Sequence, residues 1–206
     1  MSRLVLVRHG ETVWHAENRY AGRSDIALTD KGRRQAASLA EWARSANLKA
    51  IWSSTLSRAQ LTALPAAEAT GLPLQIDARL IEIDFGRGEG MTEAEMSQTF
   101  PEDRAAFLRD PAAHPLPGGE DPVEAAKRGV AVLHSIAAAS DGGRVLVVAH
   151  NTLLRLVLCQ LLGLPLGRYR TVFPHLANGA ATEIGITRES VSLLSFNVPL
   201  REMKEG

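Results

Sequence analysis

The chain is short of the residues that mark several classes of protein. It has one cysteine, Cys159, in 206 residues, so it cannot form an internal disulfide, a thiolate zinc cluster or a CxxC redox pair. Cys159 lies in an apolar stretch, 156–162, where a buried structural thiol is expected. Aromatic residues make up 5% of the chain, which argues against a surface that stacks on rings.

An excess of charge of one sign is also missing, because 23 basic residues balance 23 acidic ones. No basic block forms the footprint expected for a nucleic acid or a membrane surface, so neither partner is expected. The apolar runs are far shorter than a membrane span, and the N-terminus enters a predicted strand within three residues, without a signal-peptide pattern. We therefore expect a soluble cytoplasmic protein.

Two similar segments stand out among what is present. Each is a run of branched apolar residues that ends in a histidine, at 4–9 and again at 145–150. Such short runs are typical of strands buried on both faces of a parallel sheet. If the two strands are parallel neighbours, His9 and His150 emerge together at the carboxyl edge, where open α/β sheets bind ligands. The two segments therefore predict a small-molecule site.

Helix and strand patterns alternate along the rest of the chain. Helices are predicted at about 30–46, from Arg58 to Gly71, at 122–139 and after His150, and strands at 50–52, 180–186 and 191–196. We expect one α/β domain, 1–206, with a mostly parallel central sheet, helices on both faces and a small helical cap insertion at 86–118. The last strand would lie at an open sheet edge, where it could pair with a second copy in a homo-oligomer.

The residues at the first strand end favour an anion. Arg8 is a permanent cation beside His9, which disfavours a metal ion and matches the oxygens of a phosphate. A neutral His9 could then attack phosphorus and later release the phosphoryl group to water. Arg58 would form a second clamp, and His150 would donate to a phosphate oxygen as charge develops there. No metal and no cofactor are needed for this chemistry.

A leaving alkoxide also needs a proton, which a carboxylic acid can supply. Glu82 and Asp84 both precede the glycine turn at Gly86. Alternation along an extended segment would put both carboxyl groups on the same face, so the residues alone leave either as the donor.

Five blocks of residues occur in an order that resembles a known family. They are Arg8-His9-Gly10-Glu11-Thr12, Ser53-Ser54-x-Leu56-x-Arg58-Ala59, Leu80-x-Glu82-x-x-x-Gly86-x-x-Glu89-Gly90, Pro117-Gly118-Gly119-Glu120, and the strand that ends at His150. A three-letter Arg-His-Gly match is weak, but five ordered blocks are specific. Together they resemble the histidine phosphatase superfamily, in its phosphoglycerate-mutase-like branch.

The resemblance implies both a fold and a mechanism. It implies a parallel-sheet α/β fold with a helical cap and a phosphohistidine intermediate on His9. It also implies a phosphate pocket of Arg8, Arg58 and His150, with Glu82 rather than Asp84 as the proton donor. The partner it implies is a small phosphorylated metabolite.

Some positions depart from the family pattern. His15 stands where many members have an asparagine that touches the phosphate, and it can still donate a hydrogen bond. Asn151 and Thr152 replace two glycines after the second histidine; their amides can still point at a phosphate, and the Asn151 side chain can contact the substrate. The loop 18–23, which contains Gly22, is expected to cover the phosphate.

Three functions of different classes follow. The preferred one is a metal-independent phosphomonoesterase of the histidine acid phosphatase type. The alternative is a cofactor-dependent phosphoglycerate mutase, which the stretch 17–22 resembles. Against it, such mutases usually have Glu-Arg-His-Tyr-Gly where this chain has 82–86, and a longer cap. Both differences remove cationic substrate contacts, although Arg87 could meet an acidic substrate or simply be solvated. A phosphate-binding protein without turnover is the third possibility, disfavoured because every catalytic residue type is present.

Overall fold

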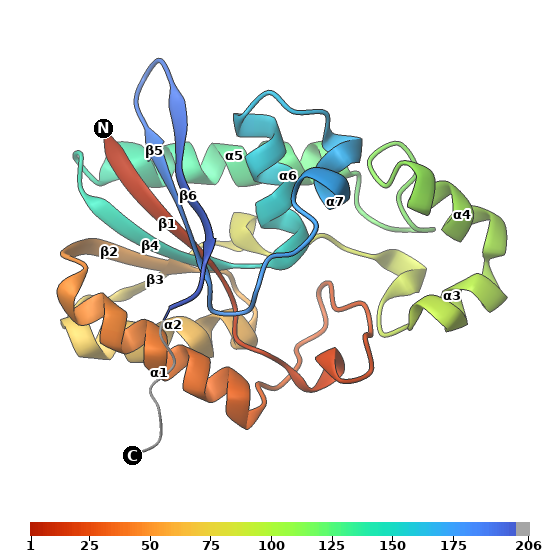
Figure 1. Ribbon diagram of the computed structural model, residues 1–206, viewed down its shortest axis with the longest axis horizontal. Coiled ribbons are helices and arrows are strands. Elements are labelled where there is room, and N and C mark those ends of the chain that lie inside the picture. The colour runs from red at the N-terminus through yellow and green to blue at the C-terminus, as the bar shows by residue number, and fades with distance from the viewer. Residues whose placement is uncertain (201–206) are drawn as a thin grey trace.

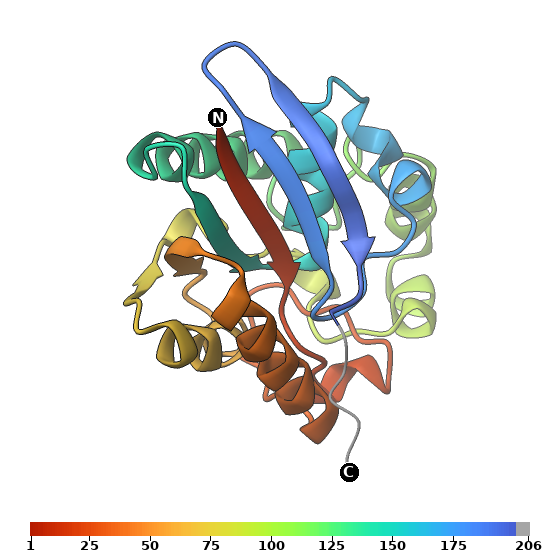
Figure 2. The ribbon, with the colours of Figure 1, turned by 60° about the vertical axis from the view of Figure 1, so that its left-hand side comes forward.

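A six-stranded sheet forms the centre of the computed structural model, which describes residues 1–200. The strands are β1 (Ser2–Arg8), β2 (Leu48–Ser53), β3 (Leu74–Ile76), β4 (Arg144–Ala149), β5 (Ala181–Ile186) and β6 (Val191–Val198). Their order is β3-β2-β4-β1-β5-β6 (Figure 2). The first four strands pair in parallel, and β5 pairs antiparallel with both of its neighbours, β1 and β6. The predicted parallel pairing of β1 with β4 is confirmed, with Val7 opposite Val148.

Helices cover both faces of this sheet (Figure 1). They are α1 (Asp30–Ser45), α2 (Ser57–Thr70), α3 (Glu93–Thr99), α4 (Pro101–Arg109), α5 (Pro122–Ala139), α6 (Asn151–Leu161) and α7 (Tyr169–Val172). Leu4 and Leu6 of β1 point into an apolar cluster with α5 and α6, while Val5 and Val7 point into another with α1 and α2. Because alternate side chains enter opposite clusters, the strand has no polar face. The predicted α/β class is confirmed.

Local signals set the helix ends close to their predicted places. Thr29 caps α1, since its hydroxyl accepts the Gly32 N–H at 3.1 Å, a contact worth about 1 kcal/mol. Helix α2 ends before Gly71, whose φ of 70° lies in the left-handed region that glycine tolerates.

Two short helices occupy the segment predicted as a cap. In Figure 1, α3 and α4 lie at the right, beyond the helices that cover the sheet. The Thr92 hydroxyl accepts the Glu95 N–H to start α3, and Pro101 starts α4. Met96 and Phe107 anchor these helices to the cluster shared by α5 and α6. The cap helices therefore share the main core.

The elements between α6 and β5 were not predicted from the sequence. Helix α7 and the short 3₁₀ turn before it, Leu166–Arg168, lie between α6 and β5. Across residues 1–200, none of the helices is both long and apolar enough to cross a membrane.

Candidate active site

The sheet brings His9 and His150 together. Their ring centroids lie 5.2 Å apart, at the carboxyl ends of β1 and β4. The backbone of His9 is held on two sides, because its N–H donates to the Ala149 carbonyl at 3.0 Å and the Asn178 amide donates to its carbonyl at 2.8 Å. Both rings are buried. The predicted convergence of the two histidines is therefore a property of the rigid strands.

The ring of His9 has a defined tautomer. Its Nδ1 lies 2.7 Å from the Gly10 carbonyl oxygen, which can only accept, so Nδ1 carries the proton. Burial, then the nearby His150, Arg58 and Arg8, hold the pKa of His9 well below its usual value. The ring is therefore neutral, and its Nε2 lone pair is available for attack on an electrophile.

Gly10 is required for a close approach of two backbone segments. A Cβ atom there would lie 2.6 Å from the carbonyl oxygen of Gly32, at the start of α1. Among residues 1–200, Gly10 is not one of the glycines with a positive φ, so its backbone conformation does not require glycine. The reason for this glycine is close packing against α1.

His150 is held by a serine hydroxyl. Ser54 Oγ lies 2.6 Å from His150 Nε2 and also accepts the Leu56 N–H at 3.3 Å. Nδ1 of His150 is buried and has no hydrogen-bond partner within residues 1–200. Burial, then Arg58 and Arg8, keeps the pKa of His150 well below its usual value, so the ring is neutral. A proton on Nδ1 would make this orphan nitrogen a donor.

Arg8 is fixed by its neighbours. Its Nη1 donates to the Leu176 carbonyl at 2.8 Å, and its Nη2 lies 2.6 Å from His15 Nε2. Because guanidinium only donates, His15 Nε2 is the acceptor, while His15 Nδ1 lies 3.0 Å from the Thr12 backbone nitrogen and 3.2 Å from the Thr12 carbonyl oxygen. Burial, then Arg8, lowers the pKa of His15 to about 4. A neutral His15 that accepts from Arg8 orients the guanidinium group. The predicted donation of a hydrogen bond from His15 to phosphate stays a prediction.

Arg58 reaches the site from the first turn of α2. It is fully buried, and its guanidinium donates to the carbonyls of Ser24 and Gly22, each at 2.6 Å. The Gly22 and Ser24 amides in turn donate to the Glu89 carboxylate, at 2.9–3.0 Å. The loop at residues 22–24 is thus bound to both Arg58 and Glu89, and the Gly22 N–H already has an acceptor. Its predicted contact with phosphate stays a prediction.

Glu82 is held at the N-terminus of α6. One of its oxygens accepts the N–H groups of Ile83 and Leu153, at 2.9 and 2.8 Å, and the other accepts the Thr152 N–H at 2.9 Å. The Thr152 amide, expected to be free for phosphate, is therefore taken by Glu82. The second oxygen keeps a free position, and Glu82 lines the cavity described next.

Asp84 lies elsewhere, which corrects the expectation that it shares a face with Glu82. Its carboxylate accepts the Gly86 N–H at 2.7 Å and lies 3.6 Å from Arg23, outside the cavity lining. The segment does not alternate like a strand because 3₁₀ turns occupy Ala78–Leu80 and Gly86–Gly88 on either side of it.

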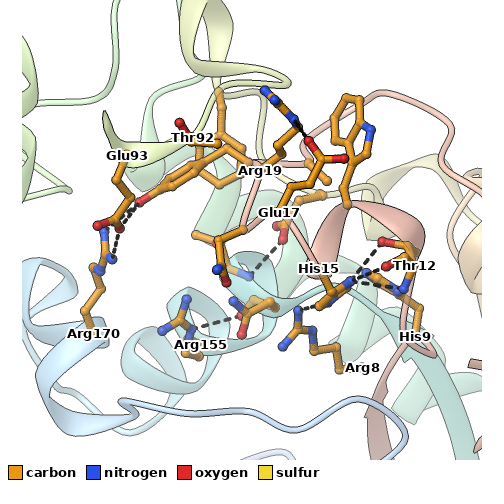
Figure 3. A pocket seen from close by; sticks show the side chains of 18 of the residues that line it. Arg8, His9, Thr12, His15, Glu17, Arg19, Thr92, Glu93, Arg155 and Arg170 are labelled. Atoms are coloured by element: carbon orange, nitrogen blue, oxygen red, sulfur yellow. Dashed lines mark hydrogen bonds and ion pairs between the residues drawn. The ribbon is translucent and has the colours of Figure 1, made fainter. Parts of the chain in front are cut away.

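A cavity of about 680 Å³ opens over His9 (Figure 3). The predicted site residues that line it are Arg8, His9, His15, Glu82 and Asn151, whereas Arg58, His150 and Gly22 are buried outside the lining. The volume exceeds that of a phosphate group and suits a small organic molecule. Within residues 1–200, no group of three or more histidine, cysteine, aspartate or glutamate side chains is placed to hold a metal ion.

Other residues that line the cavity, among them Tyr20, Arg155 and Arg170, were not predicted from the sequence. Arg155 had a detectable signal, because it lies four residues after Asn151 and therefore on the same face of the helix. Arg170 had none, since α7 has only four residues. Arg87, the cation that the sequence offered for an acidic substrate, is exposed and lies over the Phe100 ring, outside the lining.

Comparisons with known proteins agree with this geometry. A profile of the histidine phosphatase superfamily (branch 1) matches residues 4–199. Phosphoserine phosphatase 1 of Hydrogenobacter thermophilus is 36% identical over 169 residues, which cover 82% of this chain and 80% of that protein. A probable phosphoglycerate mutase, GpmB of Salmonella choleraesuis, is 38% identical over 165 residues, 80% of this chain and 77% of that one.

A solved structure extends the likeness to the fold. The mycobacterial glucosyl-3-phosphoglycerate phosphatase in complex with VO3 superposes with a TM-score of 0.86 at 30% identity, covering 95% of this chain and 99% of that one. The fold, the paired histidines and the family match lead to one conclusion: the chain belongs to the histidine phosphatase superfamily, branch 1.

Proposed function

We propose that the protein is a metal-independent phosphomonoesterase of the histidine acid phosphatase type that acts on a small phosphorylated metabolite. The observation that carries this proposal is the state of His9, a neutral ring with a free Nε2 beside the cations Arg8 and Arg58. Such a ring is a nucleophile, and such surroundings attract a phosphate dianion. Two of the similar proteins bear phosphatase names, which supports hydrolysis.

The first step transfers the phosphoryl group to the protein. Nε2 of His9 forms a bond to phosphorus as the bond from phosphorus to the ester oxygen breaks, and the Gly10 carbonyl holds the proton on Nδ1. The leaving alkoxide takes a proton from Glu82, whose less engaged oxygen has room to carry it. The products are an alcohol and a phosphohistidine.

The second step returns the protein to its starting state. Water attacks phosphorus, Glu82 takes the proton of that water, and the bond from phosphorus to Nε2 breaks. Arg8, which lines the cavity, and Arg58, whose buried Nε has no hydrogen-bond partner within residues 1–200, stabilise the phosphoryl oxygens in both steps. One ester and one water become one alcohol and one phosphate, with no metal and no cofactor.

His150 stabilises the transferring group by donation from Nδ1. This needs the proton on Nδ1, and the Ser54 hydroxyl favours that tautomer when it donates to Nε2 at 2.6 Å. The orphan Nδ1 then finds its acceptor in a phosphoryl oxygen.

A screen of phosphate release in the presence of EDTA tests the proposal. The compounds are sugar phosphates, phosphoglycerates, phosphoserine and a nucleotide-like ribazole phosphate. We expect turnover of at least one, retained in EDTA and lost in His9→Ala. Activity that EDTA removes, or no release from any compound, would refute the proposal.

A phosphoglycerate mutase is the second candidate, and the likeness to a probable phosphoglycerate mutase at 38% identity favours it. In that reaction the phosphoryl group returns from His9 to a bound hydroxyacid instead of to water. A mutase assay with 3-phosphoglycerate, run beside the phosphate assay, separates the two functions. Mutase turnover faster than phosphate release would select the mutase.

A further inference from the structure

The cavity continues past His9 to a second group of charges. In Figure 3 the labelled Arg155 lies between Arg8 and Arg170, and Glu93 lies beside Arg170. Arg155 comes from α6, Arg170 from α7 and Glu93 from the cap helix α3. We call this part of the cavity, with Tyr20, the distal end.

Arg155 is a buried cation without a counter-ion. It is 7% exposed and lines the cavity, yet within residues 1–200 no carboxylate lies within ion-pair distance of it. Its guanidinium donates to the carbonyls of Asn151 and Phe173 through long hydrogen bonds of 3.2 and 3.3 Å and lies over the Tyr169 ring. A buried unpaired charge is costly, and an anion in the cavity would offset that cost.

Arg170 is only partly compensated. Its ion pair with Glu93 is long, 3.9 Å, and the same Glu93 oxygen lies 2.9 Å from Arg104. One carboxylate is thus shared by two guanidinium groups, while the Tyr20 hydroxyl lies 3.3 Å from Arg170. The other lining arginine of this region, Arg19, is paired with Glu17 and Glu95 and adds no excess charge.

We propose that Arg155 and Arg170 form a second anion site, which binds the carboxylate of a substrate whose phosphate lies against Arg8. The proposal rests on the function proposed above and narrows the substrate to a phosphorylated carboxylic acid. A guanidinium fork matches a carboxylate. A single negative charge also fits the excess better than a second phosphate, which carries about two.

Two pairs of compounds isolate the carboxylate. O-phosphoserine and O-phosphoethanolamine differ only by that group. In the second pair, glycerol 3-phosphate has a primary alcohol where 3-phosphoglycerate has the carboxylate. A hydrogen bond between charged groups strengthens binding by about 10-fold to 100-fold. We therefore expect kcat/KM for each acid to exceed that for its matched compound by about that factor.

Arg170→Gln and Arg155→Gln should each remove most of this preference by raising KM for the acids, with little effect on the matched compounds. Arg168→Gln is the control, because it removes one positive charge from an exposed side chain of the adjacent turn. Arg170 is partly exposed, so its variant tests the site even if the buried Arg155 proves necessary for folding. Equal losses for acid and matched compound in both variants would overturn the proposal.

Binding separates this proposal from the proposed function. The affinity of the His9→Ala protein for O-phosphoserine and O-phosphoethanolamine, with and without Arg170→Gln, is measured by calorimetry. A preference for the acid that Arg170→Gln abolishes supports the anion site even if the wild type releases no phosphate, which would refute only the phosphatase. Equal affinities for the two compounds would refute the anion site, whatever the turnover.

Discussion

The two ends of the cavity are built in different ways. At the reacting end, His9 and His150 extend from adjacent parallel strands, and their rings lie 5.2 Å apart. At the distal end, Tyr20, Glu93 and Arg170 come from a loop and from two short helices, joined by polar contacts of 3.3–3.9 Å. The reacting end therefore depends on the sheet, and the distal end on contacts between surface elements.

This difference matches the two tasks of a phosphoryl-transfer enzyme. The reacting atoms need positions fixed to a fraction of an ångström, which strands provide. Substrate selection can reside in elements that vary without disturbing the chemistry. Each of the following predictions tests whether the two ends can be separated experimentally.

The largest effect is expected from Glu82→Gln at the reacting end. Removing the proposed proton donor should lower kcat/KM for an alkyl phosphate by about 10²-fold to 10⁴-fold. p-Nitrophenyl phosphate should lose far less in its first step, because its leaving group departs without a proton. Rapid-mixing measurement of the nitrophenol burst separates that step from the attack of water. Equal losses for both leaving groups in that step would exclude Glu82 as the acid.

Ser54→Ala should have a smaller effect at the same end, roughly 10-fold in kcat/KM, because His150 loses the partner that sets its tautomer. The ¹⁵N shifts of His150 should show the proton moving away from Nδ1, and Ser54→Thr should restore it. Ser53→Ala is the matched control, since Ser53 is equally buried but its hydroxyl donates to a backbone carbonyl. An unchanged tautomer in Ser54→Ala would contradict the assignment.

The strand patterns and the family resemblance were enough to predict the reacting end. Two runs of branched apolar residues predicted buried parallel strands, and parallel strands that lie side by side bring His9 and His150 to one edge. Other features needed the tertiary structure. The partners of Arg155 and Arg170 lie up to 150 residues away in sequence, and no local periodicity encodes such loop contacts. The 3₁₀ turns on either side of Glu82 and Asp84 also broke an alternation that the sequence alone favoured.

The pH dependence of stability should arise mainly at the reacting end. The native pKa values of His9 and His150 lie well below the usual 6.5, so only the unfolded chain takes up these protons near that pH. The neutral histidines contribute their full stabilisation above pH 6.5. Below that pH, the free energy of unfolding falls by about 1.4 kcal/mol per pH unit for each histidine.

Urea denaturation between pH 5 and 7 measures this slope. His150→Asn should reduce it by the contribution of one histidine, whereas His134→Asn, exposed on α5, serves as the control. If the free energy of unfolding depended on pH equally in the His150→Asn protein and the wild type, the neutral, buried state of the His150 ring would be contradicted.

The smallest effect is expected at the loop between the two ends. Glu89→Gln removes the charge that accepts the Gly22 and Ser24 amides and should lower the free energy of unfolding by about 1 kcal/mol. Glu68→Gln, on the exposed surface of α2, is the matched control. Equal unfolding midpoints in urea for the two variants would show that this clamp adds nothing to stability.

Transfer of the phosphoryl group to His9 is the central claim, and trapping the intermediate tests it most directly. The protein is mixed with a ³²P-labelled substrate, quenched in alkali within milliseconds and digested. We predict an acid-labile label on the peptide that contains His9, and none in His9→Ala protein that keeps its fold by circular dichroism. A label on another peptide, or an equal label in His9→Ala, would contradict the account.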